Sequence, residues 1–273
     1  MAGECIVFRG IGRSVESIST QRERDQLAQP LCEAAAATHP GMVRSGNEDA
    51  FGLSHEDGLF LVCDGMGGAA AGEVASSMTV AEVLKCFAGW TNAGEARLSP
   101  ATTLRDAIAS ANRAIFGKSS KDARLHGMGT TLVALVVAGN SAWVAHVGDS
   151  RCYRLRGGAL EQITLDHSLV DEQVRMGSIT VDEAARSPLR NVITRAVGSQ
   201  KAISSDIAEL SLVRGDVFLL CSDGLTRELE YEQLQAILAG ESDLPTACTR
   251  LIQAANDSGG RDNITCLLVR VSG

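Results

Sequence analysis

Short apolar runs bounded by glycine and polar turns recur along the chain, and runs of this length predict β-strands. The predicted strands cover residues 5–8, 34–38, 60–63, 130–138, 143–147, 152–155, 160–164, 192–197, 216–222 and 264–271. Glycine-containing turns at Gly139-Asn140 and Gly148–Arg151 join the middle strands into an antiparallel meander. This order disfavours a doubly wound βαβ fold.

Apolar residues recur at helical spacing in four other segments, which predict helices packed on a core. These segments are residues 73–87, 104–115, 231–238 and 246–255. Residues 166–190 are more polar, with helical character interrupted at Pro188, and indicate a mobile surface insertion. Residues 21–29 are polar and predict a helical or loose extension.

The composition is that of a globular protein. The chain has 273 residues, of which 45% are hydrophobic and 21% charged, so it can bury one large core or two modest domains. Its net charge of -8 argues against nucleic acid as the main partner. No apolar run approaches the length of a membrane span, and the N-terminus lacks a secretory apolar region.

The cysteines indicate a reducing compartment. Eight are present without a C-x-x-C pair, so a zinc site of that type is unsupported. Cys63, Cys221 and Cys266 lie in apolar strand-like runs and are expected to be buried thiols. We therefore expect a cytoplasmic protein.

Four aspartates share one kind of position. Asp64, Asp149, Asp223 and Asp262 each lie at the end of a predicted strand, next to glycine or asparagine. If these ends meet, each pair of carboxylates repels by about 4 kcal/mol at 4 Å and an effective dielectric constant of 20. Either the aspartates lie apart, or cations hold them together. Oxygen ligands favour magnesium, manganese or calcium, although any single aspartate could be a turn or capping residue.

A polar loop, Val43–Phe51, leads through the turn at Asp57-Gly58 into the strand before Asp64. If the loop and this strand form a hairpin, Arg44, Glu48 and Asp49 lie near the same end as Asp64. The loop alone is typical of a solvated turn.

Two short motifs suggest rival functions that their context does not support. Residues 65–70 match G-x-G-x-x-A, but Asp64 would repel a pyrophosphate and no acidic residue ends a second strand about 20 residues later. Gly148-Asp149-Ser150 resembles a serine-hydrolase block, which needs a downstream histidine, ideally in Asp-x-x-His; the last histidine is His167, and no such motif follows. The chain has no nucleotide P-loop motif.

Taken together, seven blocks resemble the metal-dependent serine/threonine protein phosphatases of type 2C in their bacterial form. They are residues 43–49, 64–68, 129–131, 147–151, 166–168, 222–225 and 261–263, in the family's order. The resemblance covers the chain from about residue 33. It implies an α+β fold, a four-layer α-β-β-α sandwich of two antiparallel sheets flanked by helices. Residues 33–273 would form the phosphatase domain, with a flap at about 168–190, and residues 1–32 an extension of uncertain structure.

The resemblance also implies a centre of two Mn²⁺ or Mg²⁺ ions. Asp64 would bridge both ions, the Gly65 carbonyl would join one, and Asp223 and Asp262 would hold the other. Asp149 with Asp223 matches a third, weaker ion site of bacterial relatives.

Three residues of the polar loop acquire roles from the same resemblance. Glu48 and Asp49 would act through metal-bound water, and Arg44 would bind the substrate phosphate, which the planar guanidinium suits. Arg44, Asp49 and Asp64 are thus the expected catalytic residues. A water activated by the two ions would attack phosphorus without a covalent enzyme intermediate.

The proton donor to the departing alkoxide stays open. Some relatives carry histidine where this chain has Met66 or Ala69. The remaining candidates are a metal-bound water and His167.

The expected function is hydrolysis of phosphoserine and phosphothreonine in proteins, reversing a bacterial Ser/Thr kinase, by a monomer. One alternative is a pseudophosphatase that binds phosphoproteins in a regulatory role. Another is metal-dependent phosphodiester cleavage.

Overall fold

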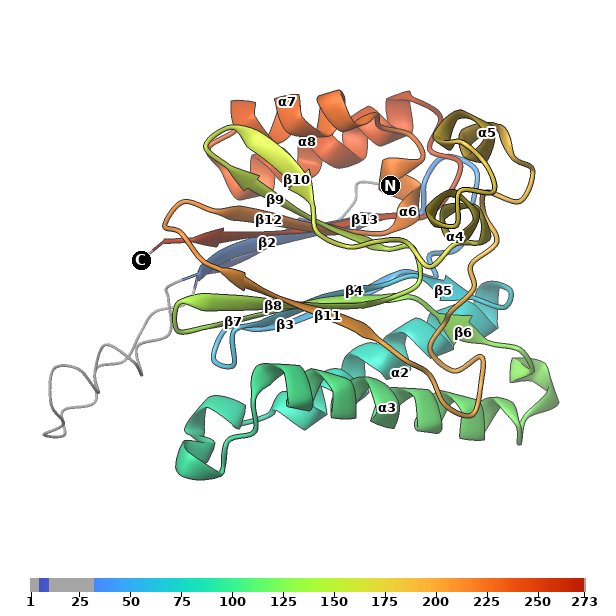
Figure 1. Cartoon of the computed structure of the whole chain (residues 1–273), viewed down its shortest axis with the longest axis horizontal. Helices are drawn as coiled ribbons and strands as arrows, with labels where there is room; N and C mark the ends of the chain where they lie inside the picture. Colours follow the sequence, from blue (N-terminus) through green and yellow to red (C-terminus); the bar gives the residue numbers. More distant parts are fainter. Residues whose placement is uncertain (1–4, 10–31, 273) are drawn as a thin grey trace, which may run out of the picture.

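The computed structural model describes residues 5–9 and 32–272, and it shows two stacked antiparallel sheets with helices on both outer faces (Figure 1). The larger sheet has six strands. In spatial order they are β1 (Cys5–Arg9), β2 (Cys32–His39), β13 (Ile264–Val271), β12 (Val217–Cys221), β9 (Arg151–Arg156) and β10 (Ala159–Gln162).

The second sheet has five strands, and a two-stranded ribbon lies beside it. The five are β11 (Asp206–Ser211), β8 (Ser141–Val147), β7 (Leu132–Ala138), β4 (Leu59–Cys63) and β3 (Ala50–Ser54). The ribbon pairs β5 (Gly65–Met66) with β6 (Gly129–Thr130).

The helices form the two outer layers, and two short ones lie in the segment 168–190 that is expected to be a flap. α2 (Ala69–Phe87) and α3 (Pro100–Ser119) cover the five-stranded sheet, while α7 (Tyr231–Gly240) and α8 (Leu244–Asp257) cover the six-stranded one (Figure 1). The short helices are η1 (Trp90–Ala96), η2 (Ala123–Leu125), α4 (Leu169–Arg175), α5 (Val181–Arg186) and α6 (Asp223–Thr226). The predicted four-layer sandwich is confirmed.

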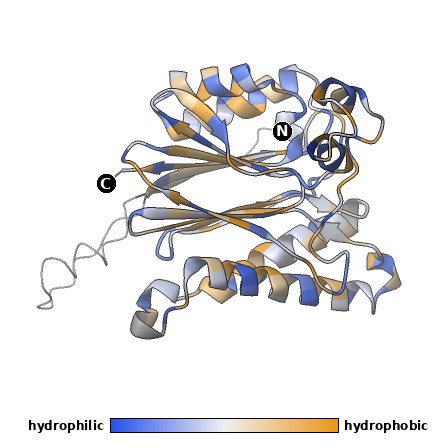
Figure 2. Ribbon diagram, in the orientation of Figure 1, coloured by the Kyte–Doolittle hydropathy of each residue, from blue (hydrophilic) through white to orange (hydrophobic). Residues whose placement is uncertain are grey.

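Burial of both strand faces explains why the sequences of the central strands are continuously apolar. In β4, Leu59, Leu61 and Cys63 pack toward α2 and α3, while Phe60 and Val62 pack between the two sheets. Strands with both faces buried lose the polar alternation of a half-exposed strand. The hydropathy colouring shows the same apolar strands between amphipathic helices (Figure 2). These layers fix the strand ends that carry the site.

The predicted single meander of residues 130–164 is wrong in one respect that matters for the site. β7 and β8 belong to the five-stranded sheet, but β9 and β10 belong to the six-stranded sheet. The chain therefore crosses between sheets at Gly148–Ser150 instead of turning within one sheet. The crossing places Asp149 at the end of the sandwich, between the layers. Sequence patterning cannot show it, because hairpin turns and sheet crossings both use glycine and polar residues.

Three local predictions need correction. Residues 192–197 form no strand, because Ile193 and Val197 make only isolated bridges, to Ser168 and Thr130. The edge strand β11 was missed, since one face is open and its sequence is mixed. The first helix starts at Ala69 rather than near Glu73.

The predicted strand at residues 5–8 is present as β1, inside the expected extension, and pairs with β2. Residues 21–29 lie outside the described residues. No helix in the described part of the chain is long and apolar enough to cross a membrane.

Candidate metal centre and active site

Both sheets deliver carboxylates to one end of the sandwich. Asp64 follows β4 of the five-stranded sheet, whereas Asp223 and Asp262 lie at ends of β12 and β13 in the six-stranded sheet. Asp149 lies in the crossing between β8 and β9. All four line one cavity of about 270 Å³, together with Arg44, Glu48 and Gly65. The structure thus brings together the aspartates that the sequence places on separate strands.

The backbone of Asp64 is fixed by Thr130, on β6, and by Thr131, which lies between β6 and β7. Its N–H donates to Thr131 Oγ1 at 3.0 Å. Its carbonyl accepts from the Thr131 N–H at 2.8 Å and from Thr130 Oγ1 at 2.7 Å. These bonds fix the backbone that carries the Asp64 carboxylate, which lines the cavity.

Burial and mutual repulsion disfavour the charged form of Asp64, Asp149, Asp223 and the nearby Asp49. Burial raises the pKa of Asp64 well above its usual range, and the charges of Asp49, Asp223, Asp149 and Asp262 raise it further. Burial, reinforced by Asp223, raises the pKa of Asp149 to about 7. Burial likewise raises the pKa of Asp223 and of Asp49 to about 6. Such a group of acids needs a cation in order to ionise together near neutral pH.

Two buried oxygens support this requirement. Among the described side chains, Asp49 Oδ1 and Asp223 Oδ1 are buried without a hydrogen-bond partner. Buried acceptors are normally satisfied, so both atoms suit a cation or an ordered water. The lining supplies carboxylates and no thiol or imidazole, which is the donor set that Mg²⁺ and Mn²⁺ prefer. The residues present therefore fit a magnesium or manganese centre.

Glu48 lines the cavity beside the aspartates, whereas its neighbour Asp49 does not. Burial raises the pKa of Glu48, while Arg44 opposes the shift. Asp49 Oδ2 accepts from Ser222 Oγ at 2.7 Å, but Asp49 does not line the cavity. Glu48 thus faces the proposed ion site, and Asp49 lies one layer deeper.

Glycine is required next to Asp64 because two backbone segments approach closely there. A Cβ at Gly65 would lie 2.2 Å from the Gly72 carbonyl oxygen and 2.6 Å from that of Glu48. A Cβ at Gly72 would lie 1.8 Å from Glu48 Oε2. Gly65 thus lets the Gly72 and Glu48 backbones approach, and Gly72 leaves the space that the Glu48 side chain occupies.

Two arginines reach the carboxylates from the rim. Arg44 donates from Nη2 to Asp262 Oδ2 at 3.0 Å, and about half of its side chain is exposed. Arg227 pairs with Asp223, and it lies 3.6 Å from Asp149 and 3.7 Å from Asp262. Sequence reasoning missed Arg227. Its signal was the i,i+4 spacing from Asp223, which places both side chains on one helical face.

A second cavity, of about 580 Å³, lies beside the first under the flap. The two share Arg44, Asp149 and Arg227 in their linings, and flap residues Val181 and Arg190 line the second one alone. A bound molecule at the carboxylates would thus lie next to the flap.

His167 lies away from both cavities. Its side chain is 1% exposed and lines neither of them. Both ring nitrogens have partners, Gly148 and Asp206. Met66 lines the smaller cavity, and Ala69 is outside the described side chains.

Comparisons with known proteins agree with this geometry. Residues 43–268 match the model of the protein phosphatase 2C family. The chain belongs to this family. A relative from Listeria monocytogenes, named serine/threonine phosphatase stp, is 38% identical over 238 residues, which cover 85% of this chain and 93% of the relative.

Solved structures of this family superpose on the chain. The Mycobacterium tuberculosis serine/threonine phosphatase PstP/Ppp is 36% identical, with a TM-score of 0.79. The match covers 89% of this chain and 99% of the PstP/Ppp chain. A PstP catalytic domain in complex with two manganese ions is 35% identical, with a TM-score of 0.79 and the same coverage. The resemblance seen in the sequence blocks is confirmed.

Proposed function

We propose that this protein phosphatase 2C member hydrolyses phosphoserine and phosphothreonine in proteins, using two Mn²⁺ or Mg²⁺ ions. The observation that carries the proposal is the set of aspartates from both sheets that line one cavity, of which Asp149 and Asp223 are buried. The similar proteins named serine/threonine phosphatases, and the family structure with two manganese ions, support it.

The residues of the cavity divide the work of holding the ions. Asp64, the Gly65 carbonyl, Asp223 and Asp262 would hold the two ions. Asp149 with Asp223 would take a third, weaker ion. When bound, the ions lower the pKa of a water molecule, so that it can attack phosphorus, and neutralise phosphoryl charge.

Other residues position that water and the substrate. Glu48 faces the cavity and can accept hydrogen bonds from water there. Asp49, held by Ser222, supports the same region from behind. Arg44 lies at the rim, and its guanidinium can bind the phosphoryl oxygens through two parallel hydrogen bonds.

The proton for the departing alkoxide is assigned to a water molecule of the cavity. His167 is not used, because a side chain 1% exposed with both nitrogens occupied cannot reach a substrate there. Met66 lines the cavity but carries no proton to donate.

Nothing observed favours the pseudophosphatase alternative. A protein that had lost catalysis would be expected to lack ion ligands, whereas Asp64, Asp223 and Asp262 are all present.

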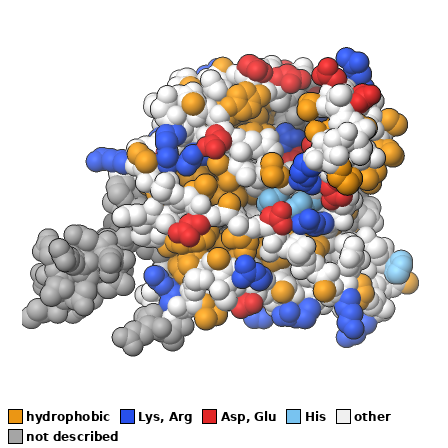
Figure 3. Space-filling view, viewed as in Figure 1, with side chains coloured by type: hydrophobic (Ala, Val, Ile, Leu, Met, Phe, Trp, Pro, Cys, Tyr) orange, Lys and Arg blue, Asp and Glu red, His pale blue; other side chains and the backbone are white. Residues whose placement is uncertain are grey.

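The proposed partners are proteins phosphorylated by a bacterial Ser/Thr kinase, which a monomer would act on in the cytoplasm. On the face drawn in Figure 3, acidic and basic side chains are interspersed, without the broad basic surface that nucleic acid requires. The seven cysteines whose side chains the structure describes are all free, which fits a reducing compartment.

The experiment measures phosphate release from a phosphothreonine peptide and from an aryl phosphate, with Mn²⁺, Mg²⁺ or EDTA. We expect turnover only with metal, and loss to background in Asp64→Asn and Asp262→Asn. Asp106→Asn, on the exposed face of α3, is the matched control and should keep full activity. Turnover in EDTA, or full activity in Asp64→Asn, contradicts the proposal. Cleavage of an aryl diester but not the monoester would indicate a phosphodiesterase.

A further inference from the structure

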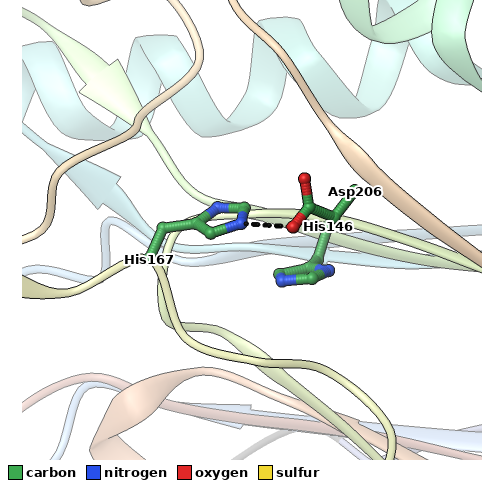
Figure 4. A group of neighbouring side chains, drawn as sticks. All are labelled: His146, His167 and Asp206. Atoms are coloured by element: carbon green, nitrogen blue, oxygen red, sulfur yellow. Dashed lines mark hydrogen bonds and ion pairs between the residues drawn. The ribbon is translucent and has the colours of Figure 1, made fainter. Parts of the chain in front are cut away.

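Two histidines and an aspartate form a cluster outside both cavities (Figure 4). The rings of His146, on β8, and His167, before α4, stack with centroids 4.5 Å apart. His167 Nε2 lies 3.2 Å from Asp206 Oδ2, on the neighbouring strand β11. Arg195 closes the group, with Nη1 3.0 Å from Asp206 Oδ1.

The hydrogen bond from Gly148 fixes the tautomer of His167. The backbone N–H of Gly148 points at His167 Nδ1, with 3.1 Å between the nitrogens. A backbone N–H can only donate, so Nδ1 must carry a lone pair. In the neutral ring the proton then lies on Nε2, from which it is donated to Asp206 Oδ2. The order of donors is therefore Gly148 N–H to His167, and His167 Nε2–H to Asp206.

The same tautomer argues against a metal ion in this cluster. The Nε2 atom that faces Asp206 carries a proton and has no lone pair to offer. Moreover, the Arg195 guanidinium lies 3.2 Å from that nitrogen and already neutralises Asp206. A buried imidazole between a backbone donor and a carboxylate is instead the arrangement that orients a neighbouring group.

The group being oriented is the chain crossing that carries Asp149. Gly148 adopts φ +100°, and a Cβ there would lie 2.7 Å from Thr131 Cγ2, so only glycine fits. On the other side of Asp149, Ser150 Oγ hydrogen bonds to Thr131 Oγ1 at 2.6 Å. Asp149 is therefore held through both of its chain neighbours. His167 supplies the side-chain contact on the Gly148 side.

His167 also holds the base of the flap. Its carbonyl oxygen accepts from the N–H of Thr194 at 2.8 Å and from Thr194 Oγ1 at 3.1 Å. The next residue, Ser168, bridges to Ile193. His167 thus joins both ends of the flap, near Ser168 and near Thr194, to the Gly148 turn before Asp149.

We propose that His167, oriented by Asp206 and Arg195, is a positioning residue that fixes the Gly148-Asp149 turn for cation binding and ties that turn to the flap base. The inference rests on the proposed function only in taking Asp149 as a cation ligand. It requires no proton transfer by His167.

Two substitutions of His167 separate its two contacts. In His167→Asn, the amide oxygen can occupy the place of Nδ1 and accept from Gly148, while the contact to Asp206 is lost. In His167→Gln, the longer amide can still reach Asp206, while the acceptor for Gly148 is lost. A role in positioning the turn therefore predicts that Asn is the better replacement, whereas a role in packing alone favours neither.

The first measurement is amide hydrogen exchange of Gly148 in the metal-free protein. We expect protection like wild type in His167→Asn and at least tenfold faster exchange in His167→Gln. The second is calorimetric titration with Mn²⁺. The binding event that is lost in Asp149→Asn identifies the ion that Asp149 holds. Loss of a partner that orients a ligand commonly weakens metal binding about 10- to 100-fold, so this ion should bind at least about tenfold more weakly in His167→Gln.

Asp206→Ala keeps the test valid if a buried substitution unfolds the protein, because the Asp206 side chain is 53% exposed. It should weaken the same ion, whereas Glu209→Gln, exposed on the same strand, should not. Equal Mn²⁺ binding in wild type, His167→Gln and Asp206→Ala overturns the inference, as does faster Gly148 exchange in the Asn variant than in Gln. Neither measurement uses turnover, so a chain that hydrolyses no phosphopeptide contradicts the proposed function separately.

Discussion

The backbone N–H of Glu48 donates to Asn263 Oδ1 at 2.8 Å, across 215 residues of sequence. The Asn263 side chain also donates from Nδ2 to the carbonyl oxygens of Pro40 and Gly46, at 3.0 and 2.8 Å. Asn263 follows Asp262 directly, so one strand start supplies a proposed ion ligand and anchors the loop that carries Arg44 and Glu48.

Replacing Asn263 by alanine should therefore affect both stability and activity. It removes three hydrogen bonds in a residue that is 6% exposed, and at about 1 kcal/mol each the unfolding free energy should fall by about 3 kcal/mol. Urea denaturation measures this change. Asn92→Ala, which loses one exposed hydrogen bond, should cost less than about 0.5 kcal/mol. An unchanged urea midpoint in Asn263→Ala would show that the loop does not depend on this anchor.

Arg227 competes with cations for Asp149, Asp223 and Asp262, because its guanidinium lies within ion-pair distance of all three. We expect Arg227→Gln to lower Tm in EDTA and to lower the Mn²⁺ concentration that half-saturates the protein. Differential scanning fluorimetry across a Mn²⁺ titration measures both. Arg250→Gln, whose partner Glu241 is outside the cavity lining, is the control. Identical Mn²⁺ titrations of Arg227→Gln and wild type would contradict the competition.

Metal-free stability should fall as pH rises from about 4 toward 7. Burial raises the pKa of Asp49 and Asp223 to about 6 and of Asp149 to about 7, above the ordinary aspartate value of about 3.9. Between these values the folded state binds more protons than the unfolded state, so the stability present at low pH is lost as pH rises. With Mn²⁺ bound the carboxylates ionise without this cost, so the gain in Tm from the ion should grow with pH.

Thermal melts between pH 4 and 7, with EDTA or Mn²⁺, test this pH dependence. Asp149→Asn removes one titrating group and should flatten the EDTA curve. A metal-free Tm that rises through this range would show that the carboxyls are not protonated in the folded protein.

Arg44 should act mainly on substrate binding. Arg44→Ala should raise KM for a phosphopeptide about tenfold, since a hydrogen bond to a charged group contributes about 1.5 kcal/mol or more. Arg44→Lys keeps the charge but loses the planar pair of donors, so its KM should lie between those of Ala and wild type. Arg124→Ala, on an exposed segment that lines neither cavity, should match wild type. A fall in kcat with unchanged KM would contradict this role.

The sequence predicted most of the buried framework because burial leaves a local signal. The runs around Phe60 and Phe218 are continuously apolar since both faces of β4 and β12 are covered. The edge strand β11 escaped because its alternation is interrupted, and residues 192–197 were misassigned because apolar side chains at the flap base resemble a strand.

The sequence identifies four site residues, Asp64, Asp149, Asp223 and Asp262. Each lies at the end of a buried strand next to glycine or asparagine, and this pattern is visible among neighbouring residues of the chain. Their meeting in one cavity was decided only by tertiary structure, because it depends on the stacking of the two sheets and, for Asp149, on the chain crossing between them at Gly148. Tertiary structure also decided the roles of Arg227 and Asn263 and the position of His167 outside both cavities. Hydrogen bonds between residues distant in the chain produce no periodic pattern in the sequence.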